Sequence, residues 1–121
     1  MQHSTNPPTK AQQKRFERMS QIGCIVSILR DGRHNVLGHV HHILSGGKRI
    51  GHDATLYLSV WHHVGQPPNG WTIQQATEEL GPSLAHNPRA FREEFGSEAE
   101  LLEFQNALLD HYTECERSDE E

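Results

Sequence analysis

Two short runs of strand-forming residues, each ending at an adjacent pair of histidines, constrain the fold of this chain more than any other feature. The first starts at Asn35 and alternates up to His41-His42, and the second, Thr55–Val60, leads directly to His62-His63. Such alternation is typical of a half-buried strand. Histidines at the end of a strand and at the start of a helix can face each other across a hairpin. The sequence therefore predicts a hairpin that brings imidazoles from its two ends to a single cation.

Histidine is concentrated in this part of the chain. Seven of the ten histidines lie between His34 and His63. Imidazole is the commonest metal-binding side chain and the one that exchanges a proton near neutral pH. The cluster therefore predicts a metal site that carries out acid-base chemistry.

Length and composition indicate one modest soluble domain. The chain has 121 residues, of which 34% are hydrophobic and 22% charged. No apolar run approaches the ~20 residues of a membrane span, so no membrane partner is expected. The polar start lacks the apolar core of a signal peptide, and Cys24 and Cys115 lie far apart. We therefore expect a cytoplasmic protein with reduced thiols.

Charge is distributed unevenly along the chain, whose formal net charge is −5. Residues 1–63 carry eight Lys or Arg against three Asp or Glu, whereas residues 64–121 carry three against thirteen. A basic first half could face a phosphate backbone while an acidic end stays away from it. Much of the acidic charge lies in residues 112–121, which we expect to be a disordered tail.

The segment before the hairpin begins with a basic helix. Residues 1–9 are polar, contain two prolines and are expected to be flexible. Thr9 then caps a helix from Lys10 to about Ser20. The apolar, β-branched segment Cys24–Leu29 is expected to be buried, with its element type left open.

Helices are also predicted after the hairpin, which makes the fold class α+β. Thr72–Leu80 is predicted to be helical and Gly81–Pro88 to be a loop. The strongest helix signal covers Ser97–His111, where Ser97 and Glu100 form a capping box and leucines with a phenylalanine supply an apolar face. One small domain over residues 10–111 is therefore expected, with a helix near each end.

Five sequence blocks follow one another over roughly residues 22–104. They are Gly23-Cys-Ile-Val-Ser, His41-His42-Ile, Gly46-Gly-Lys-Arg-Ile-Gly-His-Asp, Leu58-Ser-Val-Trp-His-His and Phe91-Arg-Glu-Glu-Phe-Gly-Ser-Glu-Ala-Glu-Leu-Leu. In this order they resemble the phage RecA-dependent nucleases of the Ref type, members of the HNH endonuclease superfamily. The resemblance implies a ββα-metal core, a divalent cation and hydrolytic cutting of DNA in the bacterial host cell, in relatives directed by RecA filaments.

The HNH pattern implies a role for each histidine of the motif. His41 matches a ligand of the catalytic cation and His42 the general base, although the order within this pair stays open. His52 occupies the position where HNH enzymes usually have an Asn that orients the base or the site. His63 matches the second metal ligand, and the cation is expected to be Mg²⁺, Mn²⁺, Ni²⁺ or Zn²⁺.

Basic residues outside the histidine motif are candidates for binding DNA. Lys48 and Arg49 lie in a glycine-rich loop that can approach a phosphate closely. Lys14, Arg15 and Arg18 share the predicted basic helix. Three further histidines fall outside the motif: His34 and His39 are expected to be incidental, and His86 is a candidate to reach the site.

The chain departs from the family pattern at a second, structural metal site. Family members commonly carry Cys-x-x-Cys before the hairpin and Cys-x-x-His at its end, a set that closes a tetrahedral zinc shell. The matching positions here are Cys24, Ser27, Ser59 and His62. A serine hydroxyl is a poor zinc ligand, so we expect that Cys24 and His62 are a remnant and that no structural zinc is held.

Three functions remain open from the sequence. The first is a working metal-dependent HNH endonuclease, because the set of four motif histidines is intact. The second is a noncatalytic protein of the same fold that binds DNA or a protein partner. The third is a zinc-binding module with structural histidines. The sequence leaves open the need for a RecA filament and the oligomeric state.

Overall fold

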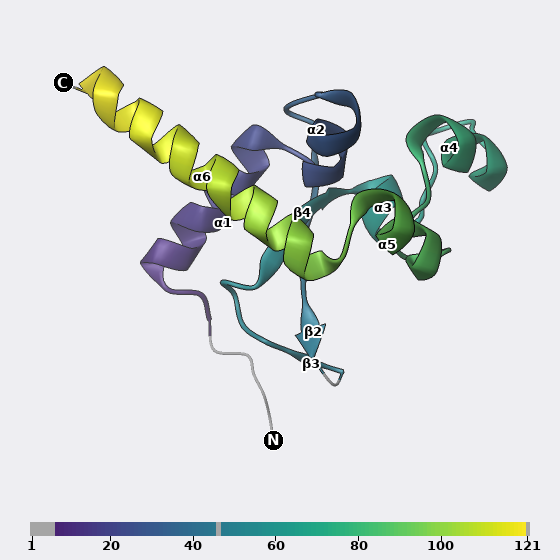
Figure 1. The fold of residues 1–121 in the computed structure, drawn as a ribbon, viewed down its shortest axis with the longest axis horizontal. Helices are drawn as coiled ribbons and strands as arrows, with labels where there is room; N and C mark the ends of the chain where they lie inside the picture. The colour runs from purple at the N-terminus through teal and green to yellow at the C-terminus, as the bar shows by residue number, and fades with distance from the viewer. Residues whose placement is uncertain (1–6, 46, 121) are drawn as a thin grey trace.

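The computed structural model describes residues 7–45 and 47–120, and within these ranges it describes the side chains up to Tyr112. It confirms a small α+β domain, in which a central antiparallel sheet is surrounded by helices (Figure 1). None of the helices in the described part of the chain is both long and apolar enough to cross a bilayer. The elements are α1 (Lys10–Ile22), α2 (Ile25–Asp31), β1 (Gly38–His42), β2 (Leu44–Ser45), β3 (Lys48–Arg49), β4 (Thr55–Ser59), α3 (Val60–Val64), α4 (Ile73–Leu80), α5 (Pro88–Phe95) and α6 (Glu98–Glu120).

The two predicted strands pair with each other as β1 and β4. The register sets Gly38 opposite Ser59 and His42 opposite Thr55. Gly38 allows the close approach, since a Cβ built on it would lie 1.9 Å from the carbonyl oxygen of Leu58. The Gly38 N–H also donates a hydrogen bond of 2.9 Å to the Tyr57 hydroxyl. These contacts fix which side chains of β1 face each side of the sheet.

Strand β4 is buried on both faces, and its alternating side chains enter two different hydrophobic clusters. Leu56 and Leu58 point to one side and Tyr57 to the other. The first cluster contains Cys24, Ile25, Val26, Ile43, Leu56, Leu58, Phe91, Phe95 and Leu101. The second contains Met19, Ile22, Ile28, Tyr57 and Leu109. Each fully buried aliphatic or aromatic side chain contributes roughly 1.5–3 kcal/mol to the free energy of folding. Because β4 supplies side chains to both clusters, it lies at the centre of the core.

Two long polar side chains hydrogen-bond backbone groups of β4 that β1 does not pair with. Gln105, which is fully buried, accepts a hydrogen bond from the Tyr57 N–H (2.9 Å) and donates one to the Thr55 carbonyl (2.8 Å). Arg15 donates to the Thr55 carbonyl (3.0 Å) and to the Asn106 side chain (2.8 Å). The guanidinium of Arg15 thus joins α1 to β4 and α6, and its assignment to DNA stays a prediction.

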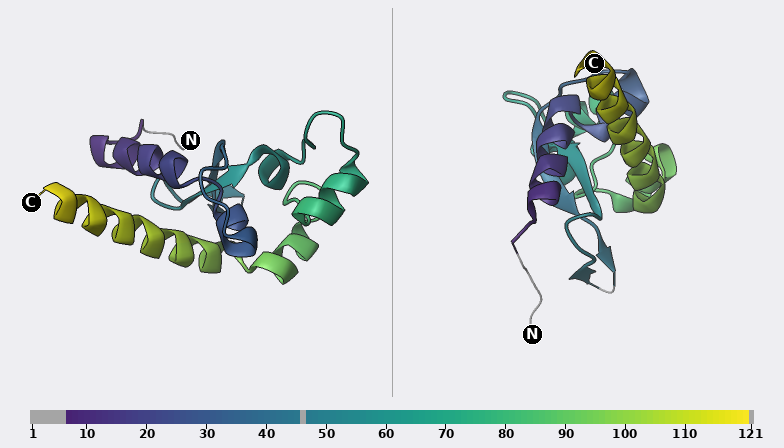
Figure 2. Two further views of the ribbon diagram at one scale, coloured as in Figure 1. Left: turned by 90° about the horizontal axis from the view of Figure 1, so that it is seen from above. Right: turned by 90° about the vertical axis from the view of Figure 1, so that its left-hand side faces the viewer.

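Helices α1 and α6 lie side by side at one end of the molecule, and α4 and α5 lie at the other (Figure 2). The predicted capping of α1 by Thr9 is confirmed, with Gln12 completing a capping box. The predicted box of Ser97 and Glu100 is also present, with bonds of 2.9 and 3.1 Å. The backbone of α6 continues beyond His111 to Glu120, because no glycine or proline interrupts this segment.

Three local elements differ from the sequence-based expectation or were left open by it. The buried segment after Gly23 forms the short helix α2, since an apolar run of this length does not distinguish a strand from a helix. The glycine-rich loop contains the small hairpin β2–β3, which projects from the body of the molecule (Figure 1). Helix α5 was not predicted, although Asn87 caps it and Pro88 occupies its first turn, two ordinary signals of a helix start.

Candidate functional site

The adjacent histidines of β1 point to opposite faces of the strand. Neighbouring side chains of an extended strand alternate between its faces. His41 meets α6 and α3 on one side, whereas His42 meets the loop residue His52 and the Phe16 ring of α1 on the other. The strand therefore separates the four motif histidines into two pairs.

The first pair consists of His41 on β1 and His63 on α3. Their ring centroids lie 5.1 Å apart, and the rings meet edge to face. The Nε2 of His41 also lies 2.7 Å from the Oε2 of Glu98, in the first turn of α6. Since a carboxylate accepts the Nε2–H of an imidazole, Glu98 fixes the orientation of the His41 ring and turns its Nδ1 away from the carboxylate.

His39, which the sequence reasoning left outside the motif, lies next to this pair. The Nδ1 atoms of His39 and His63 lie 3.2 Å apart, and the ring centroids lie 5.4 Å apart. Burial lowers the pKa of His63, and the neighbouring His41 and His39 lower it further. His63 is therefore held in its neutral form, the form in which imidazole binds a metal ion.

The second pair consists of His42 and His52. The Nε2 of His42 lies 3.0 Å from the Nδ1 of His52, and both rings pack edge to face on Phe16. Burial lowers the pKa of His42, with further contributions from the charges of Arg49, His52 and His41. His42 is therefore neutral at physiological pH and able to accept a proton.

The two pairs divide the four histidines in the same way as the sequence-based roles, with His41 and His63 as predicted ligands and His42 and His52 as predicted catalytic groups. The strand does not bring both pairs to one face. Within the described ranges, no three histidine, cysteine or acidic side chains are already arranged to hold one metal ion. The assigned roles therefore stay predictions, supported by proximity within each pair.

The four positions that match the structural zinc motif do meet in the structure. Buried His62 donates its Nε2–H to the Leu80 carbonyl (2.8 Å), and its Nδ1 faces the Ser59 hydroxyl (2.8 Å) and the Cys24 sulfur (3.8 Å). Ser27, in the first turn of α2, also hydrogen-bonds the Cys24 sulfur. Hydrogen bonds and apolar packing thus join these four positions, and the expected absence of a structural zinc stays a prediction.

This corner changes the acidity of the Cys24 thiol. Burial raises the pKa of Cys24, but the hydrogen bond and the charge of His62 act in the opposite direction. The pKa is lowered from 9.0 to about 7 as a result. The buried Cys24 thiol beside His62 is therefore more acidic than an ordinary cysteine.

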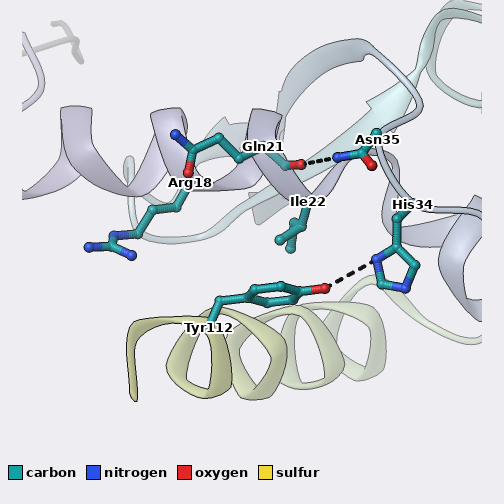
Figure 3. Close-up of a pocket in the computed structure, with 6 residues that line it drawn as sticks. All are labelled: Arg18, Gln21, Ile22, His34, Asn35 and Tyr112. Atoms are coloured by element: carbon teal, nitrogen blue, oxygen red, sulfur yellow. Dashed lines mark hydrogen bonds between the residues drawn. The ribbon is translucent and has the colours of Figure 1, made fainter. Parts of the chain in front are cut away.

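The basic residues proposed to bind DNA occupy several different places. Lys48 and Arg49 are exposed on β3, and Lys14 is exposed on α1. Arg18 instead lines a cavity of about 210 Å³ between α1, α6 and the loop before β1 (Figure 3). This cavity shares no lining residue with either histidine pair; it is lined by Arg18, Gln21, Ile22, His34, Asn35 and Tyr112.

Two other histidines interact outside the two pairs. The Nε2 of His86 lies 2.8 Å from the Gly65 carbonyl, and the ring packs against Trp61. The Nδ1 of His34 lies 3.3 Å from the Tyr112 hydroxyl, and a dashed line marks this hydrogen bond in Figure 3. Both contacts are local packing and hydrogen bonding, so neither residue is placed in the site.

Glu98 is the site residue that the sequence reasoning missed. Its partner His41 is 57 positions away in the chain, so no local spacing relates the two. An acidic residue in the first turn of a helix is expected for the helix dipole alone. No carboxylate stands beside the predicted ligands His41 and His63 in the sequence. This lack could have prompted a search for a carboxylate elsewhere in the chain.

The comparisons with known proteins identify the family of the chain. Residues 8–110 match the family described as recombination enhancement, RecA-dependent nuclease. No curated protein and no solved structure matches the chain. The matched region covers the helix α1, both histidine pairs, the Cys24–His62 corner and Glu98, so the whole of the site described above lies inside it. This chain therefore belongs to the RecA-dependent nuclease family of recombination enhancement.

Proposed function

We propose that the protein is a metal-dependent DNA endonuclease of the HNH type, with β1, β4 and α3 as its ββα-metal core. The observation that carries this proposal is the approach of His41 and His63, from a strand and from the helix that follows its partner strand. Their centroids are 5.1 Å apart. Imidazoles that bind one tetrahedral ion, with each nitrogen at about 2.0–2.1 Å, have centroids about 5 Å apart.

The donors around His41 and His63 suit a divalent cation. Both rings carry nitrogen donors, burial favours the neutral form of His63 by lowering its pKa, and the carboxylate of Glu98 supplies negative charge to the same face of β1. A carboxylate behind a metal-binding histidine raises its basicity and fixes its tautomer. When bound there, Mg²⁺, Mn²⁺, Ni²⁺ or Zn²⁺ would supply positive charge to oppose the charge that develops on a phosphodiester during hydrolysis.

His42 is the general base in this proposal. If its Nε2–H donates to the Nδ1 of His52, the Nδ1 of His42 keeps a lone pair that takes a proton from the attacking water. His52 then orients the ring and stabilises the imidazolium that forms. The lowered pKa of His42 keeps the base unprotonated before the reaction.

In this proposal, one phosphate lies across the end of β1, between the base and the ligands. His41 and His42 are consecutive, so their Cα atoms are about 3.8 Å apart even though their rings face opposite sides. A phosphodiester in this position would contact groups on both faces of the strand. The exposed Lys48 and Arg49 of the projecting hairpin lie next in the chain and are the candidates to hold the flanking phosphates.

Targeting by RecA fits the small basic surface of the chain. Among the residues predicted to bind DNA, Arg15 is used inside the fold, and Lys14, Lys48 and Arg49 are exposed. Few phosphate contacts give weak, strongly salt-dependent binding to DNA. A RecA filament that concentrates the protein on DNA would compensate for this weakness.

Plasmid cleavage tests the proposal. The wild type should nick plasmid DNA with Mg²⁺, Mn²⁺ or Ni²⁺, lose this activity in a chelator, and cut more when RecA filaments are present. His42→Ala should remove cutting while the protein keeps its fold and its metal uptake. DNA binding without cutting under every ion would instead support the noncatalytic alternative, and cutting that survives both the chelator and His42→Ala would refute the assigned mechanism.

A further inference from the structure

We propose that His39 is a third imidazole ligand of the cation held by His41 and His63, an inference that rests on the function proposed above. His39 stands outside the histidine pairs of the family motif. In this chain it lies on the same face of β1 as His41, because the two are separated by one residue of an extended strand.

The spacing of the nitrogen atoms is the main argument. The Nδ1 atoms of His39 and His63 lie 3.2 Å apart. Two nitrogens bound at about 2.0–2.1 Å to one tetrahedral ion are separated by about 3.4 Å. In the absence of a cation, the same contact is an imidazole hydrogen bond in which one Nδ1 carries the proton.

His63 stands between the two rings of β1. Its centroid is 5.1 Å from that of His41 and 5.4 Å from that of His39. Glu98 holds the Nε2 of His41, which leaves the Nδ1 of His41 for an ion, and the Nδ1 atoms of His39 and His63 face each other. His39 is exposed, and its ring can turn toward such an ion without repacking the core.

Charge distinguishes this cluster from the pair on the other face. His42 and His52 show a similar nitrogen separation, 3.0 Å. However, the positive charge of Arg49 acts on His42, whereas the carboxylate of Glu98 contacts His41. A cation is therefore favoured at the His39, His41 and His63 face and opposed at the other.

Calorimetric titration of the full chain with Ni²⁺, after chelator treatment, measures this directly. His39→Ala should weaken Ni²⁺ binding by at least about tenfold, and His34→Ala, which removes an exposed histidine outside the cluster, should leave it unchanged. If His63→Ala loses binding while His39→Ala binds as the wild type does, the role of His39 is refuted and the proposed function stands. If His41→Ala and His63→Ala also bind normally, the metal site of the proposed function fails as well.

A second variant gives a positive signal that does not depend on activity or on a loss of binding. With Co²⁺ bound, His39→Cys should show a thiolate-to-cobalt charge-transfer absorption that is absent from the wild type. His34→Cys is the matched control and should show no such band. Equal spectra for the two cysteine variants would overturn the proposal, and circular dichroism verifies that both remain folded.

Discussion

The Nε2 of His41 lies 2.7 Å from the Oε2 of Glu98, and this contact joins β1 to the start of α6. The two residues are 57 positions apart. Both side chains are mostly shielded, with exposed fractions of 15% and 22%. The long C-terminal helix therefore contributes to the site as well as to the core, since its first turn orients a histidine that we assign to the metal.

Replacement of this carboxylate by an amide tests its orienting role. Glu98→Gln keeps the size of the side chain but removes its charge, so the basicity of His41 should fall. Loss of such a partner typically costs 10–100-fold in metal affinity or activity, and we expect a decrease of about this size in both Ni²⁺ affinity and cleavage rate. Glu103→Gln, on an exposed position of the same helix, should change neither; equal behaviour of the two variants would contradict the role.

Alanine substitutions of Arg15 and Lys14, which are neighbours on α1, should affect different properties: the first stability and the second DNA binding. Arg15→Ala removes hydrogen bonds to Thr55 and Asn106 and should lower the free energy of unfolding by about 2 kcal/mol, measured by urea titration. Lys14→Ala should leave stability within about 0.5 kcal/mol and weaken DNA binding in a gel-shift assay at low salt. A stable Arg15→Ala variant with reduced DNA affinity would instead support the assignment of Arg15 to DNA binding.

The corner around His62 should regain a zinc site when its two serines are replaced. Ser27→Cys with Ser59→Cys gives three thiols and the Nδ1 of His62, whose ring is already oriented by the Leu80 carbonyl. We expect zinc to raise the melting temperature of this double variant by a larger margin than that of the wild type. Adding Cys24→Ala should remove the gain, and zinc stabilisation of the wild type through this corner would contradict the predicted loss.

The thiol of Cys24 should make stability depend on pH between 7 and 9. Its pKa is about 7 in the folded protein against an ordinary value of 9.0, so the unfolded chain binds the proton more tightly in this range. The free energy of unfolding should therefore rise with pH, by up to about 1.4 kcal/mol per unit from this group, and the contribution is lost as pH falls through 7.

Two measurements verify this origin. Thiolate absorbance in the ultraviolet should follow the titration of Cys24 in the folded protein, and His62→Gln should raise the midpoint, since burial then acts without the imidazole. Cys24→Ala should flatten the pH dependence of stability. An unchanged slope in that variant would assign the effect to other groups.

The sequence allowed prediction of features that depend on local chemistry. The caps at Thr9 and Ser97 were predictable because a side-chain oxygen satisfies the free N–H groups of a helix start within three residues. The strands β1 and β4 followed from alternation, and the division of the histidines into two pairs follows from the same period of two. Each of these inferences needed only neighbouring residues.

Features that depend on packing were not predictable in the same way. Nothing near Arg15 in the sequence indicates that its guanidinium reaches β4 and α6, so it was grouped with the exposed cations of its helix. Glu98 and His39 gain their meaning only when α6 and α3 are placed against β1. The identity of α2 as a helix also depends on its surroundings, since both of the alternatives would bury the same side chains.

The close contact at Gly38 has a consequence for the chemistry of the neighbouring histidines. A slip of β1 by a single residue against β4 would turn His42 toward Glu98 and His41 toward Phe16, with every imidazole still present. The carbonyl of Leu58 leaves no room for a side chain at position 38 and so holds the strand against such a slip. The proposed division between base and ligand therefore depends on the register of one short strand, and a one-residue insertion after Gly38 would turn the histidines of β1 to the opposite faces without altering a single functional group.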